Sequence, residues 1–266
     1  MTGSQTHAAI ETVIRLESSR LIAGLARYAR GDLGMAEELA QDAVVAALEQ
    51  WPQAGVPANP GAWLMTVAKR RAVDQFRRNR ELERKYAQIG RALAAEVDDG
   101  TAVLDRVDSA AIDDDLLRLI FISCHPILPV QGRVALTLRL LGGLTTAEIA
   151  RAYVVPEPTI GQRIVRAKKA LSGAHVPFET PDGQERQARL SSVLEVIYLI
   201  FNEGYSATAG DDWMRPDLCH EALRLGRVLA QLAPYEPEVH GLVALMEIQS
   251  SRIGARTGPS GEPVLL

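Results

Sequence analysis

The sequence predicts an all-α protein built from three helical units. Aromatic residues make up 5% of its 266 residues, and alanine, leucine and valine are frequent, a composition that favours helices over sheets. Stretches with helical apolar spacing are separated by clusters of glycine and proline, which mark loops. A chain of this length can form two or three small domains, each with its own core.

The first unit is expected to contain three helices and one proline-rich loop. Gly31, Asp32 and Gly34 separate the first two helices, and the loop 51–61 is rich in proline and glycine. The third helix is strongly basic. The predicted helices lie at about 8–30, 34–50 and 62–80, with a pattern that also allows the third to extend to Leu93.

The second unit is expected to follow an acidic linker. Residues 95–110 are acidic and poor in large apolar groups, as in linkers. Asp113, Asp114 and Asp115 are predicted to begin the next helix, because carboxylates favour the positive end of the helix dipole. A further helix is expected at about 130–141, ended by a pair of glycines.

Residues 144–171 predict two short helices joined by a tight turn. The first helix opens at Thr145 or Thr146, whose hydroxyl can cap free backbone N–H groups. The second starts near Thr159 and carries a narrow apolar stripe, which must pack on something. The stripe consists of Ile160, Ile164, Ala167 and Leu171.

The other side of this second helix is polar and basic. At 100° per residue, the side chains that point away from the apolar stripe or flank it are Gln162, Arg163, Val165, Arg166, Lys168 and Lys169. Such a face suits base edges in the major groove, and its cations suit the phosphates on either side. The alternative is an ordinary helical hairpin with a solvated basic face.

The C-terminal third predicts a separate helical unit. Pro177 and Pro181 mark its boundary, and three helices are expected at about 185–203, 215–233 and 237–254. Two of them could form an antiparallel hairpin of the tetratricopeptide kind, although no repeat signature recurs. The apolar end Val264-Leu265-Leu266 suggests a continuation of the chain.

Charge is distributed unevenly along the chain, although its net value is only −4. Residues 60–91 carry +6 and residues 126–173 carry +5, whereas residues 96–125 and 174–266 each carry −6. Two basic blocks separated by an acidic one favour contact with nucleic acid, a pattern that the net charge hides.

The sequence contains no pattern typical of an enzyme, a metal site or a cofactor site. Cys124 and Cys219 lie far apart without CxxC spacing, so neither a disulfide nor a zinc site is expected. We find no phosphate-binding glycine loop and no nucleophile elbow. The aspartates at 113–115 and His125 are better explained as structural residues. The apolar run 193–201 is too short to span a membrane and no signal peptide is evident, so we expect a cytoplasmic protein.

Three segments together are more specific than any one of them. They are AEELAQDAVVAALEQWP (36–52), NPGAWLMTVAKRRAVDQFRR (59–78) and, after the acidic linker, LTTAEIARAYVV…TIGQRIVRAKKAL. In this order they closely resemble the extracytoplasmic-function (ECF) group of bacterial RNA polymerase sigma factors, over residues 10–173. Beyond them, SSVLEVIYLIFNEGY (191–205) and DLCHEALRLGRVLAQLAPYEPEVHGLVALM (217–246) resemble the subgroup with a C-terminal tetratricopeptide-like extension.

The resemblance implies a promoter-melting domain, a helix-turn-helix domain and a helical extension. Residues 1–94 would be sigma region 2, residues 95–111 the linker, residues 112–173 sigma region 4, and residues 174–266 the extension. The implied partners are core RNA polymerase, through its β′ clamp and β flap, and promoter DNA. No membrane partner is implied, and the resemblance leaves an anti-sigma protein undecided.

The same resemblance implies three sets of site residues. Contact with the β′ clamp is implied for Asp32, Glu37, Glu38, Gln41 and Asp42. Recognition of the −10 element is implied for Val56, Pro57, Ala58, Asn59, Trp63, Arg70, Arg77 and Arg78. Recognition of the −35 element is implied for Thr159, Gln162, Arg163, Val165, Arg166, Lys168 and Lys169.

The chain departs from the family pattern at the start of the recognition helix. Glu157-Pro158 stands where members commonly have Gly or Ser before the threonine, so the turn is expected to be tilted. Gly161 occupies a position that often bears a basic side chain.

Two further points stay open at the level of sequence. We hypothesise that the acidic extension contacts or screens the basic blocks and regulates activity in cis, with a folding or docking role as the alternative. A stand-alone helix-turn-helix regulator and a helical-repeat scaffold are the competing interpretations of the whole chain.

Overall fold

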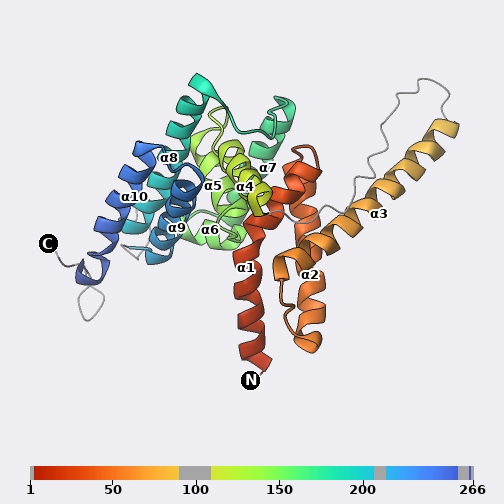
Figure 1. The fold of residues 1–266 in the computed structure, drawn as a ribbon, viewed down its shortest axis with the longest axis horizontal. Helices are drawn as coiled ribbons and strands as arrows, with labels where there is room; N and C mark the ends of the chain where they lie inside the picture. Colours follow the sequence, from red (N-terminus) through yellow and green to blue (C-terminus); the bar gives the residue numbers. More distant parts are fainter. Residues whose placement is uncertain (1–2, 90–108, 207–213, 257–263, 265–266) are drawn as a thin grey trace.

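The computed structural model describes residues 3–89, 109–206, 214–256 and 264, and in this part of the chain it is helical, with no strand (Figure 1). The predicted all-α class is therefore confirmed. The N-terminal unit comprises α1 (Gly3–Tyr28), α2 (Leu33–Ala54) and α3 (Pro60–Ile89). The helix-turn-helix unit comprises α4 (Ser109–Ser123), α5 (Val130–Leu140), α6 (Thr146–Ala152) and α7 (Glu157–Gly173). The C-terminal extension comprises α8 (Gly183–Tyr205), α9 (Pro216–Leu232), α10 (Pro237–Ser250) and the short 3-10 helix η1 (Ile253–Arg256).

Small side chains let the helices of the N-terminal unit approach one another closely. The inner face of α2 is mostly alanine, with Ala36, Ala43 and Ala47 fully buried. On α1, Gly24 faces Met65 of α3 so closely that an added Cβ would lie 2.6 Å from the methionine methyl group. The end of the flexible Met65 side chain fills the space that a Cβ would take, so Gly24 gives Met65 room where α1 meets α3.

The proline-rich loop is shorter than the sequence predicted. We expected it to begin at Trp51, but α2 continues through Pro52 to Ala54. Trp51 is 1% exposed, so its burial holds the last turn of the helix in place. Gly55, with a φ of 83°, ends the helix and donates its N–H to the Trp51 carbonyl at 2.9 Å.

The start of α4 corrects a second expectation. The helix begins at Ser109, so Asp113–Asp115 lie inside it rather than at its first turn. Asp115 is buried and its carboxylate lies 2.9 Å from Nε of Arg27 on α1 and 2.7 Å from Arg118. Burial raises the pKa of Asp115, although the charges of both arginines act to lower it. This carboxylate therefore joins α1 to α4 instead of stabilising a helix end.

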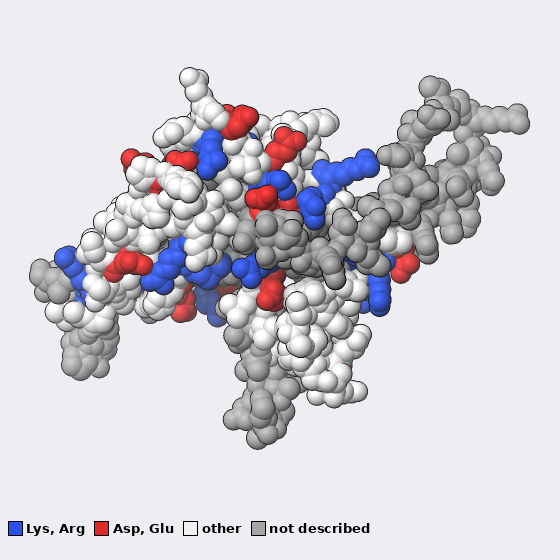
Figure 2. Space-filling view, viewed as in Figure 1, with Lys and Arg blue, Asp and Glu red and all other residues white. Residues whose placement is uncertain are grey.

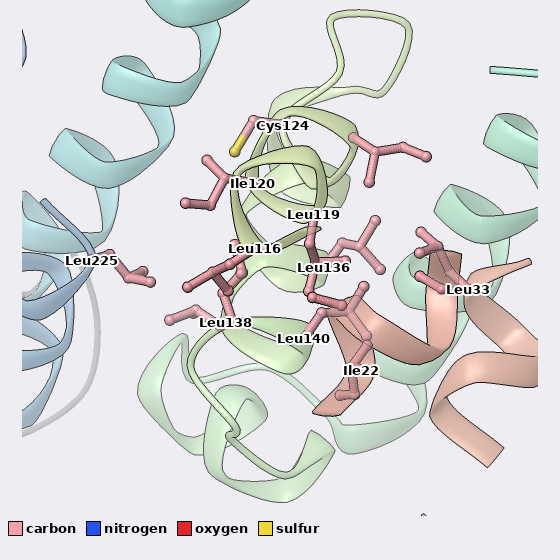
Figure 3. Packing of buried hydrophobic residues seen from close by; sticks show 14 of the residues in the cluster. Ile22, Leu33, Leu116, Leu119, Ile120, Cys124, Leu136, Leu138, Leu140 and Leu225 are labelled. Carbon is pink, nitrogen blue, oxygen red and sulfur yellow. The ribbon is translucent and has the colours of Figure 1, made fainter. Parts of the chain in front are cut away.

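The pair α4 and α5 forms the centre of the molecule. Leu119, Leu136, Leu138 and Leu140 are fully buried there. Figure 3 shows that the N-terminal unit approaches this cluster from one side and Leu225 of the extension from the other. One apolar core thus runs through all three units, so none of them is packed independently.

The extension packs as a helical hairpin with one further helix. Its three helices were predicted within a few residues of their observed bounds. At the crossing of α8 and α9, a Cβ on Gly204 would lie 2.6 Å from the backbone N of Cys219. This close approach places the two helices in direct backbone contact.

The extension is also hydrogen-bonded to the helix-turn-helix unit. Arg133 on α5 is 8% exposed and donates to Ser192 Oγ at 2.5 Å and to Glu195 Oε2 at 2.8 Å. Ser192 in turn donates to the Cys124 carbonyl at 2.5 Å. Near the other end of the contact, Arg224 on α9 donates to the Leu141 carbonyl at 2.7 Å. These bonds fix α8 and α9 against α4 and α5.

None of the helices in the described ranges is both long enough and apolar enough to cross a membrane.

Candidate polymerase and promoter interface

The first helix of the helix-turn-helix begins with a capping box. Thr145 Oγ1 accepts from the Glu148 N–H at 3.1 Å, and Glu148 Oε2 accepts from the Thr145 N–H at 2.7 Å. These bonds satisfy backbone groups that a helix start leaves open, and they confirm the predicted start of α6. At the turn that follows, Val154 adopts a φ of 49°, which is unusual for a β-branched residue.

The recognition helix α7 has the predicted buried stripe. Ile160, Ile164, Ala167 and Leu171 are between 1% and 6% exposed, in the cluster that α5, α6 and α7 share. The helix starts at Glu157, with Pro158 in its first turn, where the missing proline N–H costs no hydrogen bond. We had expected Glu157-Pro158 to precede the helix, but these two residues form its beginning.

The outward face of α7 is open to solvent. Gln162, Arg166 and Lys169 are exposed, and Val165 is 64% exposed, whereas Thr159 and Arg163 are half-buried. Within the described ranges, Arg166 and Lys169 form no ion pair. The face predicted to meet bases is thus presented as the helical geometry required, and Gly161 leaves a bare position beside it.

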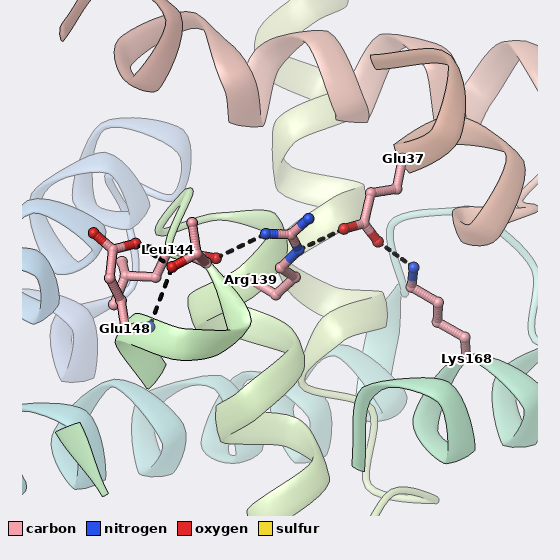
Figure 4. A network of polar contacts seen from close by, with 6 residues as sticks. Glu37, Arg139, Leu144, Glu148 and Lys168 are labelled. Carbon is pink, nitrogen blue, oxygen red and sulfur yellow. Dashed lines mark hydrogen bonds and ion pairs between the residues drawn. The ribbon is translucent and has the colours of Figure 1, made fainter. Parts of the chain in front are cut away.

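Lys168 is the exception on this helix. Its ammonium group is bound to Oε2 of Glu37 on α2, and its side chain is only 20% exposed. The other oxygen of the same carboxylate accepts from Nε of Arg139 on α5 at 2.5 Å (Figure 4). Burial alone would raise the pKa of Glu37, but the hydrogen bonds and charges of Lys168 and Arg139 bring it below its ordinary value. One residue predicted to bind DNA and one predicted to bind polymerase therefore hold each other.

The remaining residues expected to face the β′ clamp lie along α2. Glu38 and Gln41 are exposed. Asp32 caps α2, since its Oδ1 accepts from the Met35 N–H at 3.0 Å. Asp42 forms a half-exposed ion pair with Arg71 of α3 at 3.3 Å. Of the five predicted side chains, Glu38 and Gln41 are thus exposed surface groups, and two have bonds within the N-terminal unit. Glu37 is instead bound by cations of the helix-turn-helix unit.

The residues expected to meet the −10 element are presented in two ways. In the loop before α3, Val56 and Ala58 are exposed, and Asn59 uses its Oδ1 to accept from the Ala62 N–H at 3.0 Å. Pro57 is half-buried, and Arg70 is exposed on α3. The side chains of Arg77 and Arg78 lie outside the described residues.

Trp63 is only partly available for stacking on a base. It is half-buried and packs edge-on against the buried Trp51, with ring centroids 5.3 Å apart. One part of the ring supports the core and the other meets solvent, and stacking of the exposed part on a base stays a prediction.

Sequence reasoning missed Arg139 and Arg133. Both lie on α5, where they interrupt an apolar pattern, and their partners Glu37 and Glu195 are 102 and 62 residues away. A buried cation in an otherwise apolar helix requires an anion, and that was the available signal. The sequence could not indicate which carboxylate would supply it.

Two further observations concern the state of the cysteines and the distribution of charge. Cys124 and Cys219 are buried free thiols, and burial raises their pKa values to about 12 and about 11. In the face shown in Figure 2, basic and acidic side chains are interspersed. Glu195 of the extension binds Arg133 on α5 of the helix-turn-helix unit, whereas Lys168 on α7 is held by Glu37 of the N-terminal unit.

Comparison with known proteins assigns these units. Residues 16–81 match the family Sigma-70 region 2, and residues 118–171 match Sigma-70, region 4. Residues 189–266 match a family of unknown function (DUF6596), so a tetratricopeptide-like extension stays a prediction. The two matched regions, joined to an exposed recognition helix, define a sigma factor.

The relatives narrow this class further. Over 152 residues the chain is 32% identical to the ECF RNA polymerase sigma factor SigK of Mycobacterium ulcerans. The matched segment is 56% of this chain and 76% of SigK. SigK of Mycobacterium tuberculosis is 31% identical with the same coverage. The chain belongs to the ECF RNA polymerase sigma factors.

A longer relative covers most of this chain. An uncharacterised protein of Rhizobium meliloti is 45% identical over 243 residues, which are 91% of this chain. The matched segment is 56% of that protein's own length. No solved structure matches the chain.

Proposed function

We propose that this protein binds core RNA polymerase, recognises the −35 and −10 elements of a promoter and initiates transcription there. The observation that carries the proposal is the exposed polar face of α7, which stands on a buried stripe in a chain that also matches sigma region 2. Residues 1–94 would serve as region 2, residues 95–111 as the linker, residues 112–173 as region 4 and residues 174–266 as the extension.

Recognition of the −35 element would depend on α7. Gln162 and Arg166 carry the amide and guanidinium groups that pair with base edges in the major groove, and Val165 offers an apolar contact to a thymine methyl. Thr159, Arg163, Lys168 and Lys169 would bind phosphates and fix the orientation of the helix. The capping box of α6 and the buried stripe support this role, because they hold α7 rigidly on its domain.

Recognition of the −10 element would depend on the loop 55–59 and on α3. Extruding a base from the duplex costs a few kcal/mol, which a pocket and phosphate contacts must offset. The loop is held at both ends, by the buried Trp51 and by the Asn59 cap, so little of its order must be gained on binding. The exposed part of Trp63 and the Arg70 guanidinium would then hold the single strand by stacking and by charge.

Contact with the polymerase would supply most of the affinity. The chain carries a net charge of −4, so its basic faces alone hold DNA weakly. Binding of α2 to the β′ clamp, through Glu38, Gln41 and their neighbours, would raise the effective concentration of α7 and the loop at the promoter. The catalytic step would belong to the polymerase.

A run-off transcription assay tests this proposal. Purified bacterial core polymerase is incubated with the protein and a library of genomic promoter fragments, and new core-dependent transcripts are expected. Arg166→Ala should lower initiation by about five- to 150-fold, since a good bidentate base contact is worth about 1–3 kcal/mol.

The matched control is Arg252→Ala, which removes an exposed cation in the extension and should leave initiation unchanged. The proposal fails if neither the parent protein nor any variant gives a core-dependent transcript. Tight binding of duplex DNA without polymerase would instead support a stand-alone helix-turn-helix regulator.

A further inference from the structure

One carboxylate joins three helices of two different units. Glu37 on α2 lies between Arg139 on α5 and Lys168 on α7, and both cations bind its oxygens (Figure 4). The side chains are 15%, 24% and 20% exposed, so the cluster is largely withdrawn from water. Ion pairs at this depth are screened less by salt than pairs on the surface.

The position of each member is fixed by other contacts. Arg139 also donates from Nη1 to the Leu144 carbonyl at 3.1 Å, which orients its guanidinium group toward Glu37. Lys168 follows Ala167, which is anchored in the buried stripe of α7. The Asp115 carboxylate joins the same two units at a second point, through Arg27 at 2.9 Å. The closed arrangement of the two units is therefore specified by polar contacts at two separate places.

The closed arrangement is too short to reach both promoter elements. Their names place about 25 base pairs between them, or about 85 Å of duplex at 3.4 Å per base pair. From Glu37 to the loop after α2 the helix rises about 27 Å, and from Lys168 back to Thr159 about 14 Å, at 1.5 Å per residue. Glu37 and Lys168 touch through the ends of their side chains, which together add about 10 Å, so the loop and the start of α7 lie about 50 Å apart at most along these helices.

We propose that the cluster of Glu37, Arg139 and Lys168 is a clasp that holds the N-terminal and helix-turn-helix units together in the free protein. The inference rests on the proposed function, because that function gives Glu37 a contact with polymerase and Lys168 a contact with phosphate. Neither side chain can make that contact while the clasp is closed. A phosphate brought to Lys168 would also meet the Glu37 carboxylate, and like charges repel.

In the free protein the clasp lowers the apparent affinity for DNA as long as polymerase is absent. A binding-competent form that is only fractionally populated lowers the apparent affinity by that fraction. Polymerase that binds α2 removes Glu37 from the clasp and frees Lys168, so that core binding and exposure of the recognition helix are coupled. Arg139 belongs to neither predicted contact set, so its substitution weakens the clasp without removing a side chain that is expected to contact polymerase or DNA.

The first arm of the test measures closure without polymerase. Fluorophores are attached to the full chain at exposed positions of α2 and α7, through Glu49→Cys and Ser172→Cys, and energy transfer is recorded from single molecules. The native thiols are buried and protonated, so they label slowly. Arg139→Gln should reduce the high-transfer population, and Lys168→Gln should do the same. Arg252→Gln is the matched control and should not.

The second arm titrates core polymerase in run-off transcription. Arg139→Gln should reach half-maximal initiation at a core concentration about fivefold lower than the parent, the size expected when one partner of a partly buried ion pair is lost. Unchanged energy transfer in both variants overturns the clasp, and so does a changed transfer with an unchanged titration. If no variant supports initiation, the proposed function fails, and the first arm still decides whether the two units are clasped.

Discussion

The bond between Ser192 and the Cys124 carbonyl predicts that the extension and the helix-turn-helix unit unfold together. Ser192→Ala removes the hydroxyl that donates to Cys124 and accepts from the buried Arg133. Arg133 keeps Glu195, but the Cys124 carbonyl loses this donor inside the interface. Leaving a buried acceptor without its partner costs about 1–3 kcal/mol, so we expect a loss near 2 kcal/mol.

Amide hydrogen exchange measures this loss on each helix separately. At about 1.4 kcal/mol per factor of ten, the expected loss corresponds to exchange about 30-fold faster in cooperative opening. Because the two units share one core, α5 and α8 should lose protection by the same factor. Ser191→Ala is the matched control, since this neighbouring hydroxyl is exposed and donates to the Gln187 carbonyl of its own helix instead of crossing the interface.

Two results would refute the reasoning. Faster exchange confined to α8, with α5 unchanged, would mean that the extension opens as an independent unit. Equal effects of Ser192→Ala and Ser191→Ala would mean that the interfacial hydrogen bond adds nothing beyond helix propensity.

Two further predictions concern a close backbone contact and a pH dependence. Gly204→Ala should lower stability by about 1–3 kcal/mol, because the new Cβ would lie 2.6 Å from the Cys219 backbone N. Gly241→Ala is the control: its Cβ would meet open space, so it should raise stability by up to about 1 kcal/mol. Thermal denaturation followed by circular dichroism measures both effects, and an unchanged midpoint for Gly204→Ala contradicts the packing argument. Because the pKa of Glu37 lies below its ordinary 4.5 in the folded protein, its contribution is complete above that pH and is lost as the pH falls through the lowered value. The difference in unfolding free energy between parent and Glu37→Gln should therefore be constant at neutral pH and shrink in acid, and a difference that instead grows as the pH falls below 4.5 would contradict the lowered pKa.

Local patterns predicted the helices well and their ends less well. The stripe of α7 and the start of α6 followed from spacing and capping chemistry alone, since both depend on residues within a few positions of one another. Pro52 and Asp113–Asp115 misled us because burial outweighed the local preference: Trp51 holds the last turn of α2, and Asp115 is used by Arg27.

The candidate site was predictable only as separate faces. Helical periodicity identified the outward side of α7, and the resemblance to ECF sigma factors assigned roles along α2 and α3. The half-burial of Trp63 against Trp51 and the cap made by Asn59 depend on how the chain turns between two helices. No spacing within one helix contains that information.

By itself, the sequence determined that the chain is helical, that α7 carries a polar face on an apolar stripe, and that these lie in the order of a sigma factor. Periodicity and capping act over a few residues, so a sequence displays them directly. Only the tertiary structure decided that Lys168 meets Glu37, that Arg133 meets Ser192, and that three units share one core. The physical reason is that charges and apolar faces specify what kind of partner they need, while the packing of distant helices selects which partner they receive.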